Sequence, residues 1–174
     1  QSLVIEPKAV LNEWLSDISL TTGDPDKSTL KILAAGYGLK AMLKGKDISL
    51  RFSRGQLTWA EAEISNPTTY GGYAIPLDEG ELLGATHQRL SDEDPFALKA
   101  EDDVENLSGF NAHTGQEASP SAKPSRASVR VTTADTLPLI DKIEDNVWLF
   151  TGLGSRGFVF APLLAEAIVS YICG

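Results

Sequence analysis

A glycine-rich turn close to the end of the sequence places the tightest constraint on how this chain can fold. The stretch FTGLGSRGFVFAPLLAEAIVSYICG, residues 150–174, sets Gly152, Gly154 and Gly157 at the spacing G-x-G-x-x-G, between a strand-like NVWLF and a helix-like run. A dinucleotide fingerprint of this form needs a second strand and an acidic residue about 20 positions further on, and only residues 158–174 follow the third glycine. We therefore expect a strand, a turn that lets a ligand approach the backbone, and a helix N-terminus that favours an electron-rich group.

The composition indicates one globular unit of the α+β class. With 174 residues, 42% hydrophobic and 22% charged, the chain is long enough to bury its own core. Its longest apolar stretches are far short of a membrane span, and the start QSLVIEPKAV lacks the basic start and apolar run of a signal peptide. The single cysteine, Cys173, cannot form an internal disulfide, so we expect a cytoplasmic protein without a membrane partner.

Charge and metal-binding residues exclude two classes of site. The formal net charge of -9 argues against a broad nucleic-acid surface, although it leaves room for one basic patch. Two histidines, His87 and His113, with one thiol give no zinc cluster. We therefore expect no metal site.

Hydrophobic periodicity predicts mixed helices and strands. The predicted elements are a helix at 6–18, a turn-rich connection at 19–28, a buried strand at 29–36, half-buried strands within 47–64 that break at Arg54-Gly55, a hairpin turning at 77–80, an acidic helix-prone segment at 92–110 and a loop or disordered segment at 111–128. The acidic run is typical of a solvated face. Strands at 128–135, 137–140 and 146–153 precede the last helix, which is apolar almost all round and so should be buried on more than one side.

Two further features could carry chemistry. GYGLKA, residues 36–41, is a second G-x-G-x-x-A after a strand, and a simple strand-end turn explains it better than a fingerprint. Arg51, Arg54, Arg130 and Arg156 lie among apolar residues or glycines, and a planar guanidinium suits bidentate binding of carboxylate or phosphate. The alternative, an arginine paired with one of the 24 acidic residues, remains open.

Five segments together resemble the C-terminal half of FAD-dependent oxidoreductases of the D-amino-acid oxidase and glycine oxidase superfamily. They are RGQ at 54–56, YAIP at 73–76, LLGAT at 82–86, RVTTADTLPLI at 130–140 and TGLGSRGFVFAPLLAEAIVSYICG at 151–174. Within that superfamily they are most similar to the flavin domain of bifunctional enzymes that make 5-methylaminomethyl-2-thiouridine at the tRNA wobble position. The last segment is the most specific.

The resemblance implies FAD as cofactor, with the late glycine loop against the isoalloxazine and the helix N-terminus facing the pyrimidine end of the ring. The implied cofactor contacts are Ala35, Gly36, Gly152, Gly154, Ser155, Arg156, Gly157 and Phe158. The implied fold is a mixed-sheet substrate-binding domain with flanking helices, joined to the C-terminal strand and helix of an FAD-binding domain.

The resemblance also implies an activity: the carboxymethyl group is removed from the amine of the modified uridine by oxidation of the C–N bond and hydrolysis of the imine, which releases glyoxylate. Arg130 occupies the place of the family's carboxylate-binding arginine. Tyr73, Arg156 and Arg54 are further candidate substrate contacts, and no residue is assigned to catalysis. The implied partners are tRNA and a methyltransferase domain of the same polypeptide.

We expect the chain to be a fragment of a longer enzyme that binds FAD weakly or not at all by itself. Residues 1–36 would join the FAD-binding part, 37–128 would form the substrate-binding region with its loop at 111–128, and 129–174 would supply the flavin-facing strands, loop and helix. Two alternatives stay open: a glycine oxidase-like enzyme for free amino acids or small amines, and a non-catalytic domain of the same fold.

Overall fold

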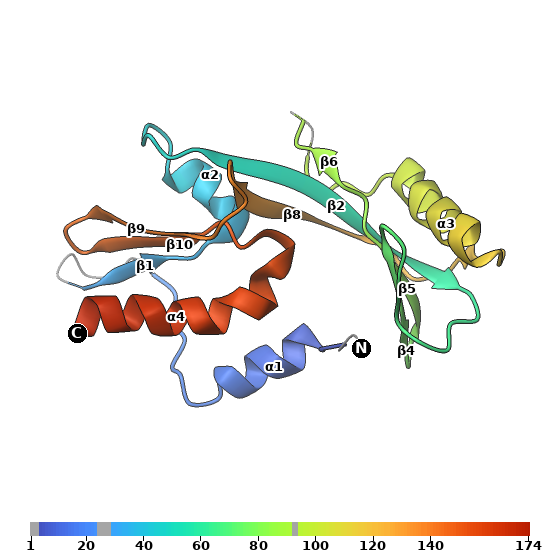
Figure 1. Ribbon diagram of the computed structural model, residues 1–174, viewed down its shortest axis with the longest axis horizontal. Helices are drawn as coiled ribbons and strands as arrows, with labels where there is room; N and C mark the ends of the chain where they lie inside the picture. Colours follow the sequence, from blue (N-terminus) through green and yellow to red (C-terminus); the bar gives the residue numbers. More distant parts are fainter. Residues whose placement is uncertain (1–3, 24–28, 92–93) are drawn as a thin grey trace.

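Two β-sheets, linked by long strands, make up the computed structural model, which describes residues 4–23, 29–91 and 94–174 (Figure 1). The smaller sheet has the strand order β1-β10-β9, with bounds Lys31–Leu33, Val147–Thr151 and Leu139–Glu144. The larger sheet consists of β3 (Thr68–Thr69), β4 (Tyr73–Leu77), β5 (Gly80–Gly84), β2 (Leu50–Glu61), β6 (Gln88–Arg89), β7 (Ser119–Pro120) and β8 (Arg126–Thr133). Four α-helices accompany the sheets in the described residues, which confirms the α+β class.

The smaller sheet brings two distant glycine segments together. β1 pairs in parallel with β10, with Ile32 opposite Trp148, so both strands end at the same edge of the sheet. Leu149 of β10 is fully buried and packs with Leu39 and Leu43 in a small core. The backbone that follows β1 therefore lies beside the backbone that follows β10.

The segments after β1 form a turn and a short helix. Gly36–Gly38 is a 3-10 turn, η1, and α2 (Leu39–Met42) is a single turn of helix. This geometry agrees with a strand-end turn at GYGLKA. The predicted strand at 29–36 is shorter in the structure, because only Lys31–Leu33 pairs with β10.

β2 is the longest strand and corrects one prediction. It runs without a break through Arg54 and Gly55, and its ladder with β8 extends from Leu50 opposite Thr133 to Leu57 opposite Arg126. The predicted break at Arg54-Gly55 was wrong because the missing side chain of Gly55 leaves room for a neighbouring side chain without interrupting the ladder. The hairpin prediction is confirmed: β4 and β5 meet at Leu77 opposite Gly80.

α3 (Ala100–Thr114) packs on the larger sheet and corrects the prediction for the acidic segment. Asp102 is completely buried rather than solvated. The same helix extends into the segment predicted as a loop at 111–128, ends at Gly115 with φ 72°, and is followed by β7 and β8. That segment is ordered partly because Asn111 Oδ1 accepts a hydrogen bond of 2.8 Å from the Ala118 amide. Residues 92–93, at the start of the acidic run, lie outside the described residues.

The N-terminal helix is shorter than predicted. α1 spans Pro7–Trp14 and ends before Ile18, which is exposed. No side chain of α1 is buried, and the helix lies apart from both sheets in Figure 1. The turn-rich connection after it was predicted to reach residue 28, and its positions 24–28 lie outside the described residues.

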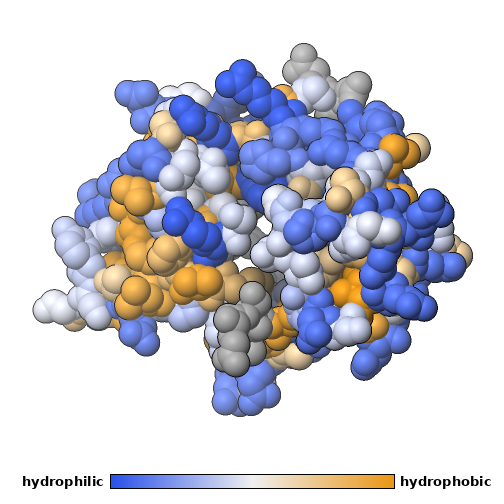
Figure 2. Space-filling view, turned by 45° about the vertical axis from the view of Figure 1, so that its right-hand side comes forward, coloured by the Kyte–Doolittle hydropathy of each residue, from blue (hydrophilic) through white to orange (hydrophobic). Residues whose placement is uncertain are grey.

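The C-terminal helix α4 (Gly157–Cys173) contradicts its predicted burial. Ile168 is its one buried residue among those described, whereas Val159 and Tyr171 are 73% and 78% exposed. Figure 2 shows apolar surface gathered on the half of the molecule that carries α4. By length and composition alone, Gly154–Cys173 is also long and apolar enough to cross a membrane, which corrects the expectation that no stretch approaches that length. Core helices of soluble proteins meet the same criterion.

Candidate functional site

A cavity at the carboxyl ends of β1 and β10 gathers five of the predicted site residues. Its volume is about 300 Å³. The predicted residues that line it are Gly36, Arg130, Gly152, Gly154 and Gly157. The other lining residues were not among the predicted site residues; they are Ala34, Val129, Val131, Phe150, Thr151 and Leu153. All of them except Phe150 adjoin a predicted residue along the chain, and Phe150 lies two positions before Gly152, on the same side of the strand under a period-two pattern.

Three of the four glycines that line this cavity, Gly36, Gly152 and Gly154, have a backbone conformation that favours glycine. Gly152 has φ 78°, and a Cβ there would lie 3.0 Å from the Thr133 methyl group. Gly154 has φ 56°, with its Cβ position 2.9 Å from the Thr132 methyl group. Gly36 has φ 52° and open space around it. Because L-residues with side chains rarely adopt these φ values, the cavity wall is bare backbone that a flat ligand can approach.

A hydrogen-bonded turn supports this glycine loop from behind. The Thr133 hydroxyl donates to the Asp135 carboxylate at 2.7 Å, and the Leu137 amide donates to the same carboxylate at 3.1 Å. The Thr133 and Leu137 hydrogen bonds hold the pKa of Asp135 below its usual value. The carbonyl of Leu137 lies 3.3 Å from the Cβ position of Gly152, so the turn fixes one side of the loop.

Arg156 anchors the glycine loop to this turn. Its Nη2 donates to the Thr136 carbonyl at 3.0 Å, and its guanidinium lies over the Phe160 ring at 5.1 Å. The side chain is exposed and does not line the cavity. Ser155 and Phe158 are also outside the cavity lining, as is Ala35, although each adjoins a residue that lines it.

The N-terminus of α4 adjoins the cavity. The 3-10 turn η2 (Gly154–Arg156) leads directly into α4, and both Gly154 and Gly157 line the cavity. No side chain caps this end of α4, and its first turn holds no acidic residue. The positive end of the helix dipole is therefore available to an electron-rich group.

Arg130 brings a positive charge to the cavity, and within the part of the chain that the structure describes it has no acidic partner. Its Nη1 donates a long hydrogen bond of 3.4 Å to the Thr86 carbonyl. No carboxylate among the described residues forms an ion pair with it. A guanidinium carries five N–H donors, so most of those on Arg130 are available to a ligand.

Tyr73 lies within the electrostatic reach of Arg130. Burial raises the pKa of the half-buried Tyr73 phenol, and the charge of Arg130 partly opposes that rise. The Tyr73 hydroxyl is 3.3 Å from the Cβ position of Gly84, its cross-strand partner. Tyr73 is not part of the cavity lining, so it neighbours the arginine rather than the glycine loop.

We predict that Arg130→Ala raises the pKa of Tyr73 further, because the substitution removes the cation that opposes the effect of burial. The pKa of Tyr70 is raised by burial alone, so it should not move and serves as the internal control. NMR titration of ¹³Cζ-labelled tyrosine measures both groups. Since the folded-state pKa of Tyr73 lies above its ordinary value of 10.0, the stability from the protonated phenol is complete below that pH and is lost as the pH rises through the folded-state pKa. Equal shifts of Tyr73 and Tyr70 would contradict the electrostatic effect of Arg130 on Tyr73.

Arg54, a predicted substrate contact, is instead part of the interface between β2 and α3. It is 3% exposed and forms an ion pair with the buried Asp102. It also donates to Gln56 Oε1 at 2.9 Å and to the Ala97 carbonyl. The alternative interpretation from the sequence, an arginine paired with an acid, therefore describes Arg54, which does not line the cavity.

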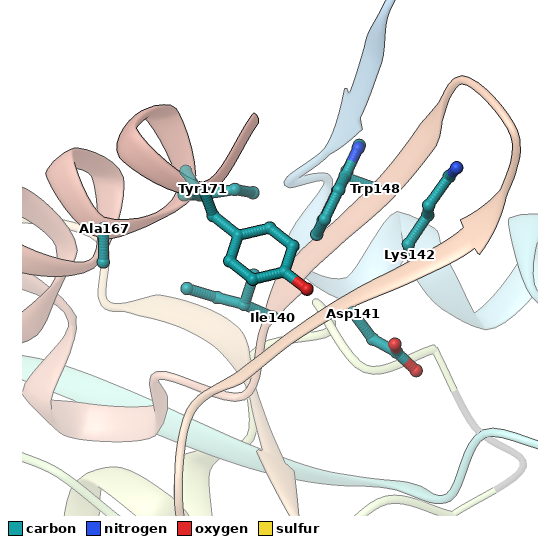
Figure 3. A pocket seen from close by; sticks show the side chains of 7 residues that line it. Ile140, Asp141, Lys142, Trp148, Ala167 and Tyr171 are labelled. Atoms are coloured by element: carbon teal, nitrogen blue, oxygen red, sulfur yellow. The ribbon is translucent and has the colours of Figure 1, made fainter. Parts of the chain in front are cut away.

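Another cavity, of about 380 Å³, lies between the small sheet and the C-terminal half of α4 (Figure 3). Trp148 and Tyr171 meet there edge to face, with ring centroids 5.3 Å apart. None of the predicted site residues lines this cavity. It also lacks the glycine backbone and the unpaired guanidinium, so we place the candidate site at the ends of β1 and β10.

A glycine-lined cavity at the carboxyl ends of parallel strands, beside a helix N-terminus, is typical of proteins that bind nucleotide cofactors. Residues 13–171 match the family described as FAD dependent oxidoreductase, and the chain belongs to that family. The bifunctional tRNA 5-methylaminomethyl-2-thiouridine biosynthesis protein MnmC of Caulobacter vibrioides is 44% identical over an aligned stretch of 149 residues. The alignment covers 83% of this chain and 24% of that relative, so the chain spans about a quarter of the relative's length.

Solved structures give the same fold. Glycine oxidase from Geobacillus kaustophilus is similar with a TM-score of 0.61 at 20% sequence identity, over 79% of this chain and 40% of that one. Iminodiacetate oxidase from Chelativorans is similar with a TM-score of 0.61 at 18% identity, over 81% of this chain and 41% of that one. At these identities the likeness establishes the fold alone, and it agrees with the fold that the sequence segments implied.

Proposed function

We propose that this chain is the substrate-binding region and the C-terminal flavin-site piece of an FAD-dependent enzyme that removes the carboxymethyl group from carboxymethylaminomethyl-uridine at the tRNA wobble position. The observation that carries the proposal is the Arg130 guanidinium, which lines the glycine-rich cavity without an acidic partner among the described residues. Such a group is suited to a substrate carboxylate. The 44% identity to an MnmC protein supports tRNA as the substrate.

The cavity residues fit the isoalloxazine end of FAD. The backbone of Gly36, Gly152 and Gly154 offers a flat wall in which a side chain would fill the space or strain the loop. The amides at the start of α4 would face the electron-rich pyrimidine end of the ring. Ala35, Ser155, Arg156 and Phe158 would flank this contact. When bound, the flavin supplies the two-electron acceptor for oxidation of the substrate C–N bond.

The protein's own part in this reaction is to bind and orient the substrate. Arg130 would hold the carboxylate of the glycine-like end by two parallel N–H bonds, which fixes the direction of the adjoining carbon. Tyr73, close enough for its pKa to respond to Arg130, would donate a further hydrogen bond to that carboxylate. After oxidation, hydrolysis of the imine releases glyoxylate and leaves the aminomethyl group on the uridine.

The proposed partners follow from the same assignment. The net charge of -9 gives this chain little affinity of its own for tRNA. The relative in Caulobacter vibrioides is named as a bifunctional protein, and a methyltransferase domain in the same polypeptide could supply the basic surface. A tRNA substrate places the enzyme in the cytoplasm.

A second candidate function keeps the flavin and the carboxylate site but gives them a small amine. Two solved structures of the same fold are named glycine oxidase and iminodiacetate oxidase. Both substrates named there carry a carboxylate close to an amine, which the Arg130 site would fit equally well. The two functions differ in the other group attached to the substrate's amine. In the first function this group is the uridine of a tRNA, and in the second it is hydrogen or a small group.

The test uses the complete polypeptide encoded by the gene, purified and assayed for flavin absorbance and glyoxylate release. We expect bound FAD and glyoxylate from tRNA that carries carboxymethylaminomethyl-uridine, with little from free glycine or sarcosine. Activity on glycine or sarcosine alone would select the small-amine function. Absence of flavin from the complete polypeptide would contradict both and leave a non-catalytic domain. The isolated chain should bind FAD weakly or not at all, and tightly bound FAD in it would contradict that part of the proposal.

A further inference from the structure

Gly55 lies directly beneath the guanidinium of Arg130. An ideal Cβ on Gly55 would be 2.4 Å from Nη1 and 2.9 Å from Nη2 of Arg130. Both distances are far inside van der Waals contact, so the guanidinium occupies the space that any other residue at position 55 would fill. Gly55 does not need its glycine for an unusual backbone conformation, because its place in the β2 ladder, opposite Ser128, is regular.

The Thr86 carbonyl, which accepts a hydrogen bond from Arg130, is also held in place by β2. The Thr86 carbonyl accepts from Arg130 Nη1 and lies 2.6 Å from the Cβ position of Gly55. Thr86 exchanges two hydrogen bonds with Gln56: its hydroxyl accepts from the Gln56 amide at 3.0 Å, and its own amide donates to the Gln56 carbonyl at 3.3 Å. The carbonyl is therefore fixed to the strand that carries Gly55.

Gln56 in turn ties this arrangement to α3. Its side chain is completely buried, and Nε2 donates to Asp103 Oδ1 and to the Lys99 carbonyl, each at 2.8 Å. Asn106 Nδ2 donates to the Gln56 carbonyl at 3.0 Å. A side chain held by this many buried partners cannot shift independently. The position of the Arg130 guanidinium is thus set by β2 and α3, not by its own rotamer preference alone.

We propose that Gly55 is a positioning residue for substrate binding. Its missing side chain leaves the space that the Arg130 guanidinium occupies, and there the Thr86 carbonyl accepts a hydrogen bond from Arg130. The inference rests on the proposed function, because it assigns to Arg130 the substrate carboxylate. A methyl group at position 55 would displace the guanidinium, and because it would also lie 2.6 Å from the Thr86 carbonyl, it would push away the hydrogen-bond acceptor as well. The displaced guanidinium would no longer meet a carboxylate in the geometry of two parallel bonds.

The experiment measures binding of glycolate, a small carboxylate probe, to the FAD-loaded complete polypeptide through the change in the flavin absorption spectrum. We expect Gly55→Ala to weaken glycolate binding at least tenfold. Gly109→Ala is the matched control, because its Cβ would lie 3.6 Å from the Tyr70 ring, an ordinary contact on α3. It should leave the dissociation constant within twofold of wild type. Equal effects of the two substitutions would overturn the proposal.

A double-mutant cycle separates positioning from general damage. In the Arg130→Ala background the guanidinium is gone, so Gly55→Ala should weaken glycolate binding no further. Independent, multiplying effects of the two substitutions would show that Gly55 does not act through Arg130 and would overturn the proposal.

The pKa of Tyr73 reports the same displacement in this chain without any flavin. Because Arg130 lowers that pKa, Gly55→Ala should raise it in the wild-type background and leave it unchanged in the Arg130→Ala background. If Arg130→Ala itself leaves glycolate binding unchanged, the proposed carboxylate site fails. In that case the Tyr73 pKa still tests whether Gly55 positions Arg130, and a Tyr73 pKa that Gly55→Ala leaves unchanged would overturn that positioning role.

Thr86→Val is the second variant if Gly55→Ala does not fold. It keeps the shape of a side chain that is 2% exposed but removes the hydroxyl that accepts from the Gln56 amide. The loosened carbonyl should weaken glycolate binding in the same direction by a smaller factor and shift the Tyr73 pKa upward. Unchanged values of both quantities in Thr86→Val would overturn the proposal.

Discussion

Asp102→Ala should lower the free energy of unfolding of this chain by about 3–5 kcal/mol, because it leaves a buried guanidinium without its counter-charge. Asp102 is completely buried and Arg54 is 3% exposed, so water cannot replace the lost carboxylate. Gln88 Nε2 would also lose its acceptor on Asp102. Domains of this size have total stabilities of about 5–15 kcal/mol. Urea denaturation followed by circular dichroism should show a markedly earlier transition or an unfolded chain.

Glu101→Ala is the matched control, because Glu101 precedes Asp102 in the first turn of α3 but is exposed. Its effect should stay within about 0.5 kcal/mol. Replacing both partners, as in Arg54→Met with Asp102→Leu, should recover much of the lost stability, since well-packed apolar pairs often replace buried ion pairs without loss. An Asp102→Ala chain that unfolds at the wild-type urea concentration would contradict the proposed importance of the pair.

The burial of Asp102 shows why part of the fold could not be read from local sequence. An acidic run in a helix is typical of a solvated face, and nothing within residues 100–114 indicates that Asp102 and Asp103 point toward a sheet. The signal lies elsewhere, in the polar residues Arg54, Gln56 and Thr58, which alternate along one face of β2 and meet α3. Only the tertiary contact joins the two patterns.

More of the candidate site could be predicted from the sequence, because each of its elements is formed by residues close together in the chain. Glycines at fixed spacing after a strand predict a tight turn and a helix start whatever the rest of the chain does, and the structure has both at residues 152–157. What the sequence could not supply is the parallel pairing of β1 with β10, which joins Gly36 to Gly152 across more than a hundred residues. The resemblance to a known family provided that link in advance.

α4 shows the opposite error, because the sequence predicts a buried helix and the structure leaves most of it exposed. Its residues are apolar almost all round, which is typical of a helix buried on several sides, yet Leu163 and Tyr171 are exposed. The Caulobacter relative is about four times as long as the segment matched here. We infer that the apolar pattern of α4 suits contacts with polypeptide that the longer proteins contain. The hydrophobic periodicity of a helix indicates the environment to which the helix is suited. How much of its surface is buried depends on the contacts present in the chain.

Arg130→Ala in the FAD-loaded complete polypeptide should reduce kcat/KM for the carboxylate-bearing substrate by on the order of 100- to 1,000-fold. Loss of one partner from a desolvated, hydrogen-bonded charge pair costs about 2–5 kcal/mol, and the substrate carbon also loses its orientation. Arg130→Lys should fall in between, because an ammonium keeps the charge but cannot form two parallel bonds. The measurement is kcat/KM from steady-state glyoxylate release by the wild-type enzyme, Arg130→Ala and Arg130→Lys.

The control for this prediction is Arg156→Ala, which removes a neighbouring cation whose guanidinium donates to the Thr136 carbonyl on the exposed surface. Its effect on kcat/KM should be much smaller than that of Arg130→Ala, and its effect on loop stability comparatively larger. A substrate analogue with the carboxylate replaced by a neutral amide provides the complementary test, since Arg130→Ala should barely change its already slow turnover. If Arg156→Ala were the more damaging substitution, the carboxylate would bind at the glycine loop, and Arg130 would serve to hold Thr86 and Tyr73 in place.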